Sequence, residues 1–224
     1  MMRKIEILLL LAILLLPVLG RGQSRFFAGG GAGIATLSAD GQTSITPASI
    51  AFSTYRPFNG AALNLFSGTH FNDFLSLQAN YIWNRNQITA TSSFASSEAL
   101  AVHEEKRRSS QNSVIFDLLL YFRNRESWAR PYLSAGGGGV RFKTDQRELL
   151  NSSGGTSRLP AEFTSKELAL RVAVGIDIEI AKQFAVRYTF SETISRNPIS
   201  RRLIPRGERN LANFQNLFGI VKCF

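Results

Sequence analysis

Residues 167–180 read ELALRVAVGIDIEI. Every second residue from Leu168 to Ile180 is Leu, Val or Ile, whereas the intervening positions carry Glu, Ala, Arg, Gly or Asp. A helix would spread these two sets around its circumference, and only an extended chain separates them onto opposite faces. The stretch therefore predicts a β-strand with one aliphatic face and one small or charged face.

Similar alternation recurs along the chain, and the connecting segments differ in length. The eight predicted strands are 25–37, 58–67, 75–84, 112–122, 130–143, 167–180, 184–191 and 214–224. Long connectors are expected near 38–57, 85–111, 144–166 and 196–210, and short ones near 68–73, 123–129 and 181–183. This alternation is typical of an antiparallel up-and-down transmembrane β-barrel, whose short turns face the periplasm and whose long loops face outward.

Charged residues on the face opposite the aliphatic row favour a membrane barrel over a soluble lipocalin-like barrel, which would bury its apolar face inside. The interior of eight strands is just wide enough for side chains, and the large aliphatic rows would overfill it. The polar faces offer both signs of charge, as a closed lumen requires because buried charges must be paired. The predicted charge network of the lumen is Asp117, Arg141, Lys143, Arg171, Asp177, Glu179 and Arg187.

Aromatic residues gather near the predicted strand ends, where membrane barrels carry interfacial girdles. These residues are Phe58, Trp83, Phe122, Trp128, Tyr132, Phe142, Phe184 and Phe224. The repetition of aromatics at strand ends supports a barrel in lipid.

The N-terminus predicts export. A basic start at Arg3 and Lys4 precedes an apolar run over 5–19, and Gly20 and Gly22 offer small residues for cleavage. This pattern predicts a signal peptide over 1–22 and a barrel domain over 23–224. The alternative, a membrane-anchoring helix, needs a longer apolar run of about 20 residues. With a formal net charge of +10, an exported chain is expected to meet anionic lipid or acidic polysaccharide and no nucleic acid.

Three segments carry a family resemblance. They are the glycine-rich stretch 26–33 (FFAGGGAG), the stretch 130–140 (RPYLSAGGGGV) and the ending 218–224 (FGIVKCF). The chain resembles the small outer-membrane barrels of OmpA/OmpX type, which implies location in the cell outer membrane. The resemblance also implies that Phe224 is a signal for the outer-membrane barrel assembly machinery, although Lys222 departs from the apolar residue usual there. The separate periplasmic domain of some relatives is not expected.

Residues suited to catalysis or metal binding are few. His70 is expected in a short turn and His103 in a long loop, at opposite rims, whereas zinc needs three or four ligands. His103 adjoins Glu104 and Glu105, but this adjacency does not imply a catalytic triad. Neither glycine run precedes a helical pattern, so phosphate binding is not expected. We therefore expect no enzyme activity, no cofactor and no metal.

A basic connector is the candidate binding segment. Arg201, Arg202, Arg206 and Arg209 lie in the last long connector, and arginine side chains match phosphate and carboxylate geometry. They predict contact with lipopolysaccharide or an acidic surface ligand, and a solvated loop is the alternative. The expected function is a monomeric structural or binding barrel with a plugged lumen, serving envelope integrity, adhesion or surface-ligand contact. The alternatives are a lipid-modifying barrel enzyme of acyl-ester hydrolase type and a soluble periplasmic carrier.

Overall fold

The computed structural model describes residues 25–38, 42–46, 49–96, 100–153, 161–199 and 210–224. The expected signal peptide over 1–22 and the four arginines of the basic connector lie outside this part of the chain. In the described residues, no helix is long and apolar enough to cross a membrane.

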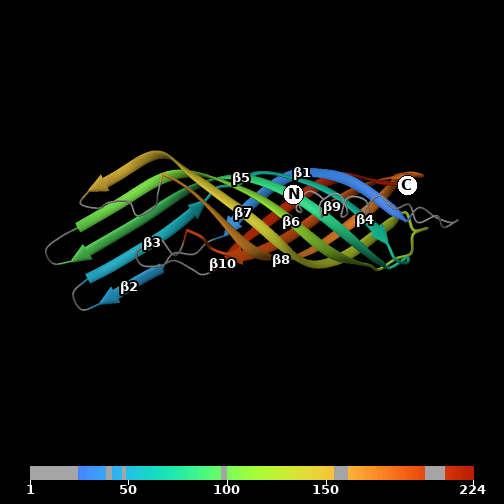
Figure 1. Ribbon diagram of the computed structural model, residues 1–224, viewed down its shortest axis with the longest axis horizontal. Coiled ribbons are helices and arrows are strands. Elements are labelled where there is room, and N and C mark those ends of the chain that lie inside the picture. Colours follow the sequence, from blue (N-terminus) through green and yellow to red (C-terminus); the bar gives the residue numbers. More distant parts are fainter. Residues whose placement is uncertain (1–24, 39–41, 47–48, 97–99, 154–160, 200–209) are drawn as a thin grey trace, which may run out of the picture.

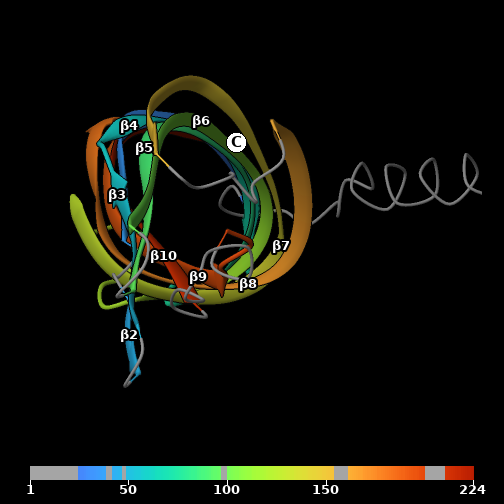
Figure 2. The same ribbon diagram turned by 90° about the vertical axis from the view of Figure 1, so that its left-hand side faces the viewer.

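Eight antiparallel strands form a closed ring in the order β5-β4-β1-β10-β9-β8-β7-β6, and β6 returns to β5. The ring strands are β1 (Phe26–Ser38), β4 (Gly60–His70), β5 (Leu75–Ser96), β6 (Leu100–Tyr121), β7 (Ala129–Ser153), β8 (Glu162–Ala181), β9 (Phe184–Arg196) and β10 (Asn210–Cys223). Figure 2 shows this ring end-on. Closure gives every ring strand a hydrogen-bonded neighbour on each side, as a chain in lipid requires. The predicted all-β barrel of eight strands is confirmed.

Two additional strands, β2 (Gln42–Thr46) and β3 (Ser49–Pro57), form a hairpin outside the ring. β3 pairs with the outer part of β5, whereas β4 pairs with the inner part of the same strand. In Figure 1 this hairpin and the outer ends of β5, β6 and β7 extend to the left, at the opposite end from the C-terminus. The outer region is therefore a sheet that continues the barrel wall.

This outer sheet corrects the expected long loops. Segments 85–111 and 144–166 were expected as connectors, yet most of 85–111 belongs to β5 and β6, and 144–153 and 162–166 belong to β7 and β8. Segment 38–57 likewise contains β2 and β3. Strands beyond the membrane meet water on their outer face, so they lose the apolar row on which the alternation depends. In this outer region the strands continue to pair through their backbones although the sequence no longer alternates.

The aliphatic row of β8 faces outward. Leu168 is 86% exposed and Leu170 is 71% exposed, whereas Arg171 and Asp177 are buried inside the ring. The same division holds on β6, where Phe116 is exposed and Asp117 is buried. The apolar surface therefore faces lipid, and the soluble-carrier alternative is wrong.

The predicted aromatic girdle is only partly correct. Phe58, Phe122, Trp128, Phe184 and Phe224 are exposed on the barrel surface. Tyr132 and Phe142, by contrast, are buried in the lumen. On β7 the aromatic residues point inward, and the outward positions Ala135, Gly137 and Gly139 are small.

Candidate functional site

Two ion pairs lie in the lumen near its short-turn end. Arg187 of β9 donates through Nε to Oδ1 of Asp177 at 2.6 Å and through a terminal nitrogen to Oδ2 at 2.7 Å. Arg171 of β8 pairs with Asp117 of β6. All four side chains are buried. Each buried charge has an opposite charge as its direct partner, as burial of ionised groups requires.

Two amides of β5 connect these ion pairs into one chain of hydrogen bonds. Arg187 donates to Oε1 of Gln78 at 2.6 Å, and Nε2 of Gln78 donates to Oδ1 of Asn80 at 2.7 Å. Nδ2 of Asn80 then donates to Oδ2 of Asp117 at 3.1 Å. Because β5 and β9 lie on opposite sides of the ring, this chain crosses the lumen.

Aromatic rings surround the Arg187 guanidinium. Its central carbon lies 4.7 Å from the ring centre of Phe66, 5.0 Å from that of Tyr132 and 5.6 Å from that of Phe27. The hydroxyl of Tyr121 donates to Asp177 and accepts from Arg187, at 3.0 and 2.9 Å. Cation–π contact and hydrogen bonding together fix this charge in place.

A second polar layer crosses the lumen further outward. Nδ2 of Asn213 donates to Oε1 of Gln111 at 2.9 Å, and these residues belong to β10 and β6 on opposite sides of the ring. Nε2 of Gln215 donates to Oδ1 of Asn84 at 3.4 Å. Side chains from opposite walls therefore meet at two levels.

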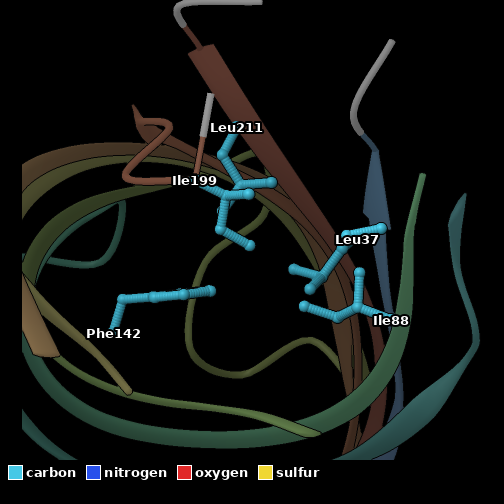
Figure 3. Close-up of a cluster of buried hydrophobic side chains, with 6 residues drawn as sticks. Leu37, Ile88, Phe142, Ile199 and Leu211 are labelled. Carbon is cyan, nitrogen blue, oxygen red and sulfur yellow. The ribbon is translucent and has the colours of Figure 1, made fainter. Parts of the chain in front are cut away.

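An apolar cluster closes the outer end of the lumen. Its members are Leu37, Ile88, Ala90, Phe142, Ile199 and Leu211, and Figure 3 shows five of them converging inside the ring. Ile199 follows β9 in the last long connector and is fully buried. The start of this connector is thus anchored within the barrel mouth.

A third ion pair lies inside the outer part of the barrel at the level of the apolar cluster, because Glu105 and Arg107 are in register with Ala90 and Ile88. Arg107 donates to Oε1 of Glu105 at 2.7 Å, and Nε2 of His103 lies 3.5 Å from Oε2 of the same carboxylate. Arg107 also contacts the ring of Phe163 at 6.0 Å. Glu105 and Arg107 were not predicted as part of the lumen network, although they share the inward parity of Asp117 on β6.

The structure separates the predicted lumen charges into two groups. Asp117, Arg171, Asp177 and Arg187 come together inside the ring. Arg141 and Lys143 are exposed on the outer face, so their assignment to the lumen was wrong. Glu179 shares the inward parity of Asp177 and lies at the open short-turn end of the lumen, where it is exposed and lines a pocket. For Arg141 and Lys143 the error follows from β7, where Tyr132, Val140 and Phe142 occupy the inward positions.

The histidines also differ from expectation. His70 was expected in a solvated turn, but it is buried at the end of β4, with Nδ1 2.6 Å from Oγ of Ser76. His103 belongs to β6 instead of a loop. In the described part of the chain, no group of three or more His, Cys, Asp or Glu side chains is arranged to hold a metal ion.

A pocket of about 230 Å³ opens at the short-turn end of the lumen, below the Asp177–Arg187 pair. Phe27, His70 and Tyr121 line its inner wall, and Arg130 lies over the Tyr121 ring with its central carbon 3.9 Å from the ring centre. Both signs of charge border the pocket, so its chemistry does not favour one class of ligand.

Phe224 lies at the end of the ring-closing strand pair. Its backbone nitrogen donates to the carbonyl oxygen of Phe26 at 3.0 Å, and its side chain is exposed. Nζ of Lys222 lies 4.9 Å from the Phe224 ring centre. The cation thus packs on the aromatic ring at the lipid-facing rim, as long cationic side chains do at membrane interfaces.

Comparison with known proteins gives one family and several solved barrels. The family model described as "Outer membrane protein beta-barrel domain" matches residues 7–215. Neisserial surface protein A is 15% identical, with 91% of this chain and 100% of that chain covered and a TM-score of 0.54. Ail, the attachment invasion locus protein of Yersinia pestis, is 12% identical, with 89% and 99% covered and a TM-score of 0.48. The outer membrane protease OmpT from Escherichia coli is 10% identical, with 93% and 99% covered and a TM-score of 0.48. No curated protein matches the chain.

Proposed function

Because the chain belongs to the outer membrane protein β-barrel domain family, we propose that it acts as a closed surface barrel. Its location is the outer membrane, and its proposed role is structural support of the envelope and contact with ligands outside the cell. The outer strands and connectors would make this contact, while the ring anchors them in lipid.

The closed lumen is the observation that carries this proposal. Hydrogen bonds join opposite walls through Gln78 and Arg187 and again through Gln111 and Asn213. The apolar cluster that contains Phe142 and Ile199 fills the lumen from the level of the second layer outward, because Phe142 is in register with Gln111. Eight-stranded barrels with filled interiors have no open channel, so a binding role is favoured over solute conduction.

The outer sheet supplies the contact surface. It comprises β2, β3 and the outer parts of β5, β6 and β7, which pair in the order β2-β3-β5-β6-β7. Binding residues commonly lie on segments that a rigid scaffold positions, and this sheet extends directly from the barrel wall. The basic connector with Arg201, Arg202, Arg206 and Arg209 is proposed to add contacts to an acidic polysaccharide.

A binding experiment tests this role. Cells displaying the protein are incubated with immobilised heparin and with full-length lipopolysaccharide, and retention is measured against salt. Replacing the four connector arginines by Ser should lower the affinity for these ligands about tenfold, because charge-assisted contacts are lost. A control variant, Arg25→Gln with Arg123→Gln, removes two exposed charges near the short turns and should retain binding. Equal retention of wild type and the connector variant would contradict the proposal.

Enzyme activity is the second candidate, and the contact between His103 and Glu105 is the observation that favours it. His103 faces inward and its side chain is only 12% exposed, which is unfavourable for attack on an ester in the surrounding lipid. We therefore propose a non-enzymatic barrel. Mass spectrometry of lipid A from cells with and without the protein distinguishes the two, since an acyl-ester hydrolase removes acyl chains and His103→Ala would abolish that change.

A monomer in contact with outer-membrane lipids is the proposed physiological form. The ring closes within one chain, so the strands need no second copy to satisfy their hydrogen bonds. Sedimentation of the refolded protein in detergent tests this proposal, and a concentration-independent monomer mass is expected.

A further inference from the structure

The lipid-facing surface has a furrow along β7. The outward side chains of β7 at Ala135, Gly137 and Gly139 are small or absent, whereas Leu118 of β6 and Val172 of β8 are large neighbours. The furrow deepens into a groove of about 580 Å³ around Ala135. Its lining is mostly aliphatic, with Glu192 at the border formed by β9.

Two cations stand directly opposite each other at the outer end of this furrow. Arg141 of β7 is paired in register with Lys166 of β8, and both side chains are exposed on the outer face. Like charges directly opposite on one face of a sheet destabilise the pairing. Neither residue forms an ion pair with any side chain that the structure describes. An anion bound between Arg141 and Lys166 would relieve their mutual repulsion, so the arrangement favours one.

The basic surface continues outward by one more row. Lys143 of β7 and Arg85 of β5 lie in this row on either side of Ser110 of β6. Lys143 also lies near Glu162, with 3.5 Å between Nζ and Oε2. From β5 to β8 the cations span three strand spacings, or about 14 Å. That distance is larger than the diameter of one phosphate group, and it suits a head group that carries two phosphates.

The distance along β7 matches the depth of one lipid leaflet. Arg141 lies six residue steps after Ala135, which is about 20 Å along an extended strand. A strand tilted by about 40° descends about 15 Å over that length. This equals half of the hydrocarbon core of about 30 Å. A phosphate at Arg141 would thus place an acyl chain along Gly139 and Gly137 with its end in the groove.

We infer that this face of β6–β8 binds a phosphorylated glycolipid of the outer leaflet. One phosphate lies between Arg141 and Lys166, and the second meets the row of Lys143 and Arg85. One acyl chain occupies the furrow over Gly139 and Gly137. The site requires only that the barrel lies in the outer membrane, so it goes beyond the proposed surface-contact role and is tested separately from it.

The test uses the refolded full-length barrel in detergent, with bis-phosphorylated lipid A as the probe and native mass spectrometry as the readout. The double variant Arg141→Gln with Lys166→Gln is expected to weaken binding about tenfold, because it removes both partners of one phosphate. The variant Arg25→Gln with Arg123→Gln removes equal charge near the short turns, and it should bind as the wild type does. Heat-modifiable gel mobility establishes that each variant is folded.

Two comparison lipids identify the source of the phosphate. Dephosphorylated lipid A and phosphatidylglycerol are both expected to bind the wild type about tenfold more weakly than bis-phosphorylated lipid A. Equal binding of phosphatidylglycerol would overturn the glycolipid assignment. Unchanged binding of lipid A to the double variant would overturn the site itself.

The acyl path has its own variant, Gly139→Leu. No atom lies within 4 Å of a Cβ built at Gly139, so the larger side chain fills the furrow without a clash at the backbone. We expect about threefold weaker binding of lipid A, comparable to the loss of one buried methylene contact. Unchanged affinity in this variant would overturn the placement of the acyl chain.

Discussion

Asp117 on β6 and Arg171 on β8 form a buried ion pair across the strand that lies between them. The residue of β7 in register with both is Gly136, and a Cβ there would collide with the Asp117 carboxylate. Tyr132 and Thr189 meet in the same way across Gly175, with 2.7 Å between their hydroxyl oxygens. Glycine in an inward position therefore lets residues two strands apart bond to each other.

Gly136→Val is expected to break the pair of Asp117 and Arg171. Disrupting a buried ion pair costs about 3–5 kcal/mol, so the free energy of unfolding should fall by about that amount. Urea unfolding of the refolded barrel in lipid vesicles measures the loss. Gly139→Val is the matched control, because nothing lies within 4 Å of its added Cβ. Equal stability of the two variants would contradict the role given to Gly136.

Asp177→Asn is expected to cost about 3–5 kcal/mol, because the buried Arg187 charge is left without its carboxylate. Replacing both residues with Leu should cost less than the single change, since no buried charge then remains unpaired. Urea unfolding again provides the comparison. Glu179→Gln serves as the control, because Glu179 is exposed and its change should stay within about 0.5 kcal/mol. A double variant less stable than Asp177→Asn would argue against this account.

Val174→Arg is expected to destabilise the barrel in vesicles by about 2–4 kcal/mol, because Val174 faces lipid within the aliphatic row of β8. Leu150→Arg changes an exposed residue of the outer part of β7 and should have little effect. Unfolding in vesicles distinguishes the two positions. Similar costs at both positions would mean that the membrane boundary lies elsewhere.

Ile199→Asp is expected to release the start of the last connector from the barrel mouth. Ile199 is fully buried in the apolar cluster, and an unpaired carboxylate is costly there. Trypsin digestion of the protein in vesicles should then cleave faster at Arg201 and Arg202. Leu149→Asp, at an exposed site on β7, is the control. Cleavage at the wild-type rate in Ile199→Asp would show that the anchor is dispensable.

Phe224→Ser is expected to lower the amount of assembled barrel in the outer membrane. The exposed ring lies at the end of β10, where the proposed recognition by the assembly machinery would take place. The heat-modifiable fraction in outer-membrane preparations measures assembly. Phe218→Ser, on the same lipid-facing side of β10, controls for simple loss of apolar surface. Equal assembly of both variants would argue against a special role for Phe224.

The sequence allowed the ring to be predicted wherever the two faces of a strand differ strongly. On β8 the aliphatic row and the charged row separate completely, so both the strand and its outward face were predicted correctly. On β7 the outward face holds Ala135, Gly137 and Gly139, while Tyr132 and Phe142 point inward. Because the aromatic residues of this strand face the lumen instead of lipid, the prediction placed Arg141 and Lys143 on the wrong face.

The remaining features depend on contacts that no local pattern specifies. Glu105 and Arg107 pair inside the outer part of β6, where the stretch of charged residues reads equally well as a solvated loop. Their burial follows from the length of the β5–β6 and β6–β7 pairings, which backbone hydrogen bonds set. The hydrogen-bonded chain through Gln78 and Asn80 likewise joins strands far apart in the sequence.

Asn86 marks a boundary between two parts of the wall. Between β3 and β4, at Phe58 and Asn59, the chain carries one residue more than the facing part of β5, and such an irregularity forms a bulge. Nδ2 of Asn86 donates to the carbonyl oxygens of Ala35 and Phe58, at 2.9 and 3.0 Å. This side chain ties the bulge to β1 and so supports the register of the ring at the point where β3 ends and β4 begins. Changes in the length or sequence of the β2–β3 hairpin are therefore expected to leave the pairing of the ring unchanged, because the boundary at Asn86 lies between them.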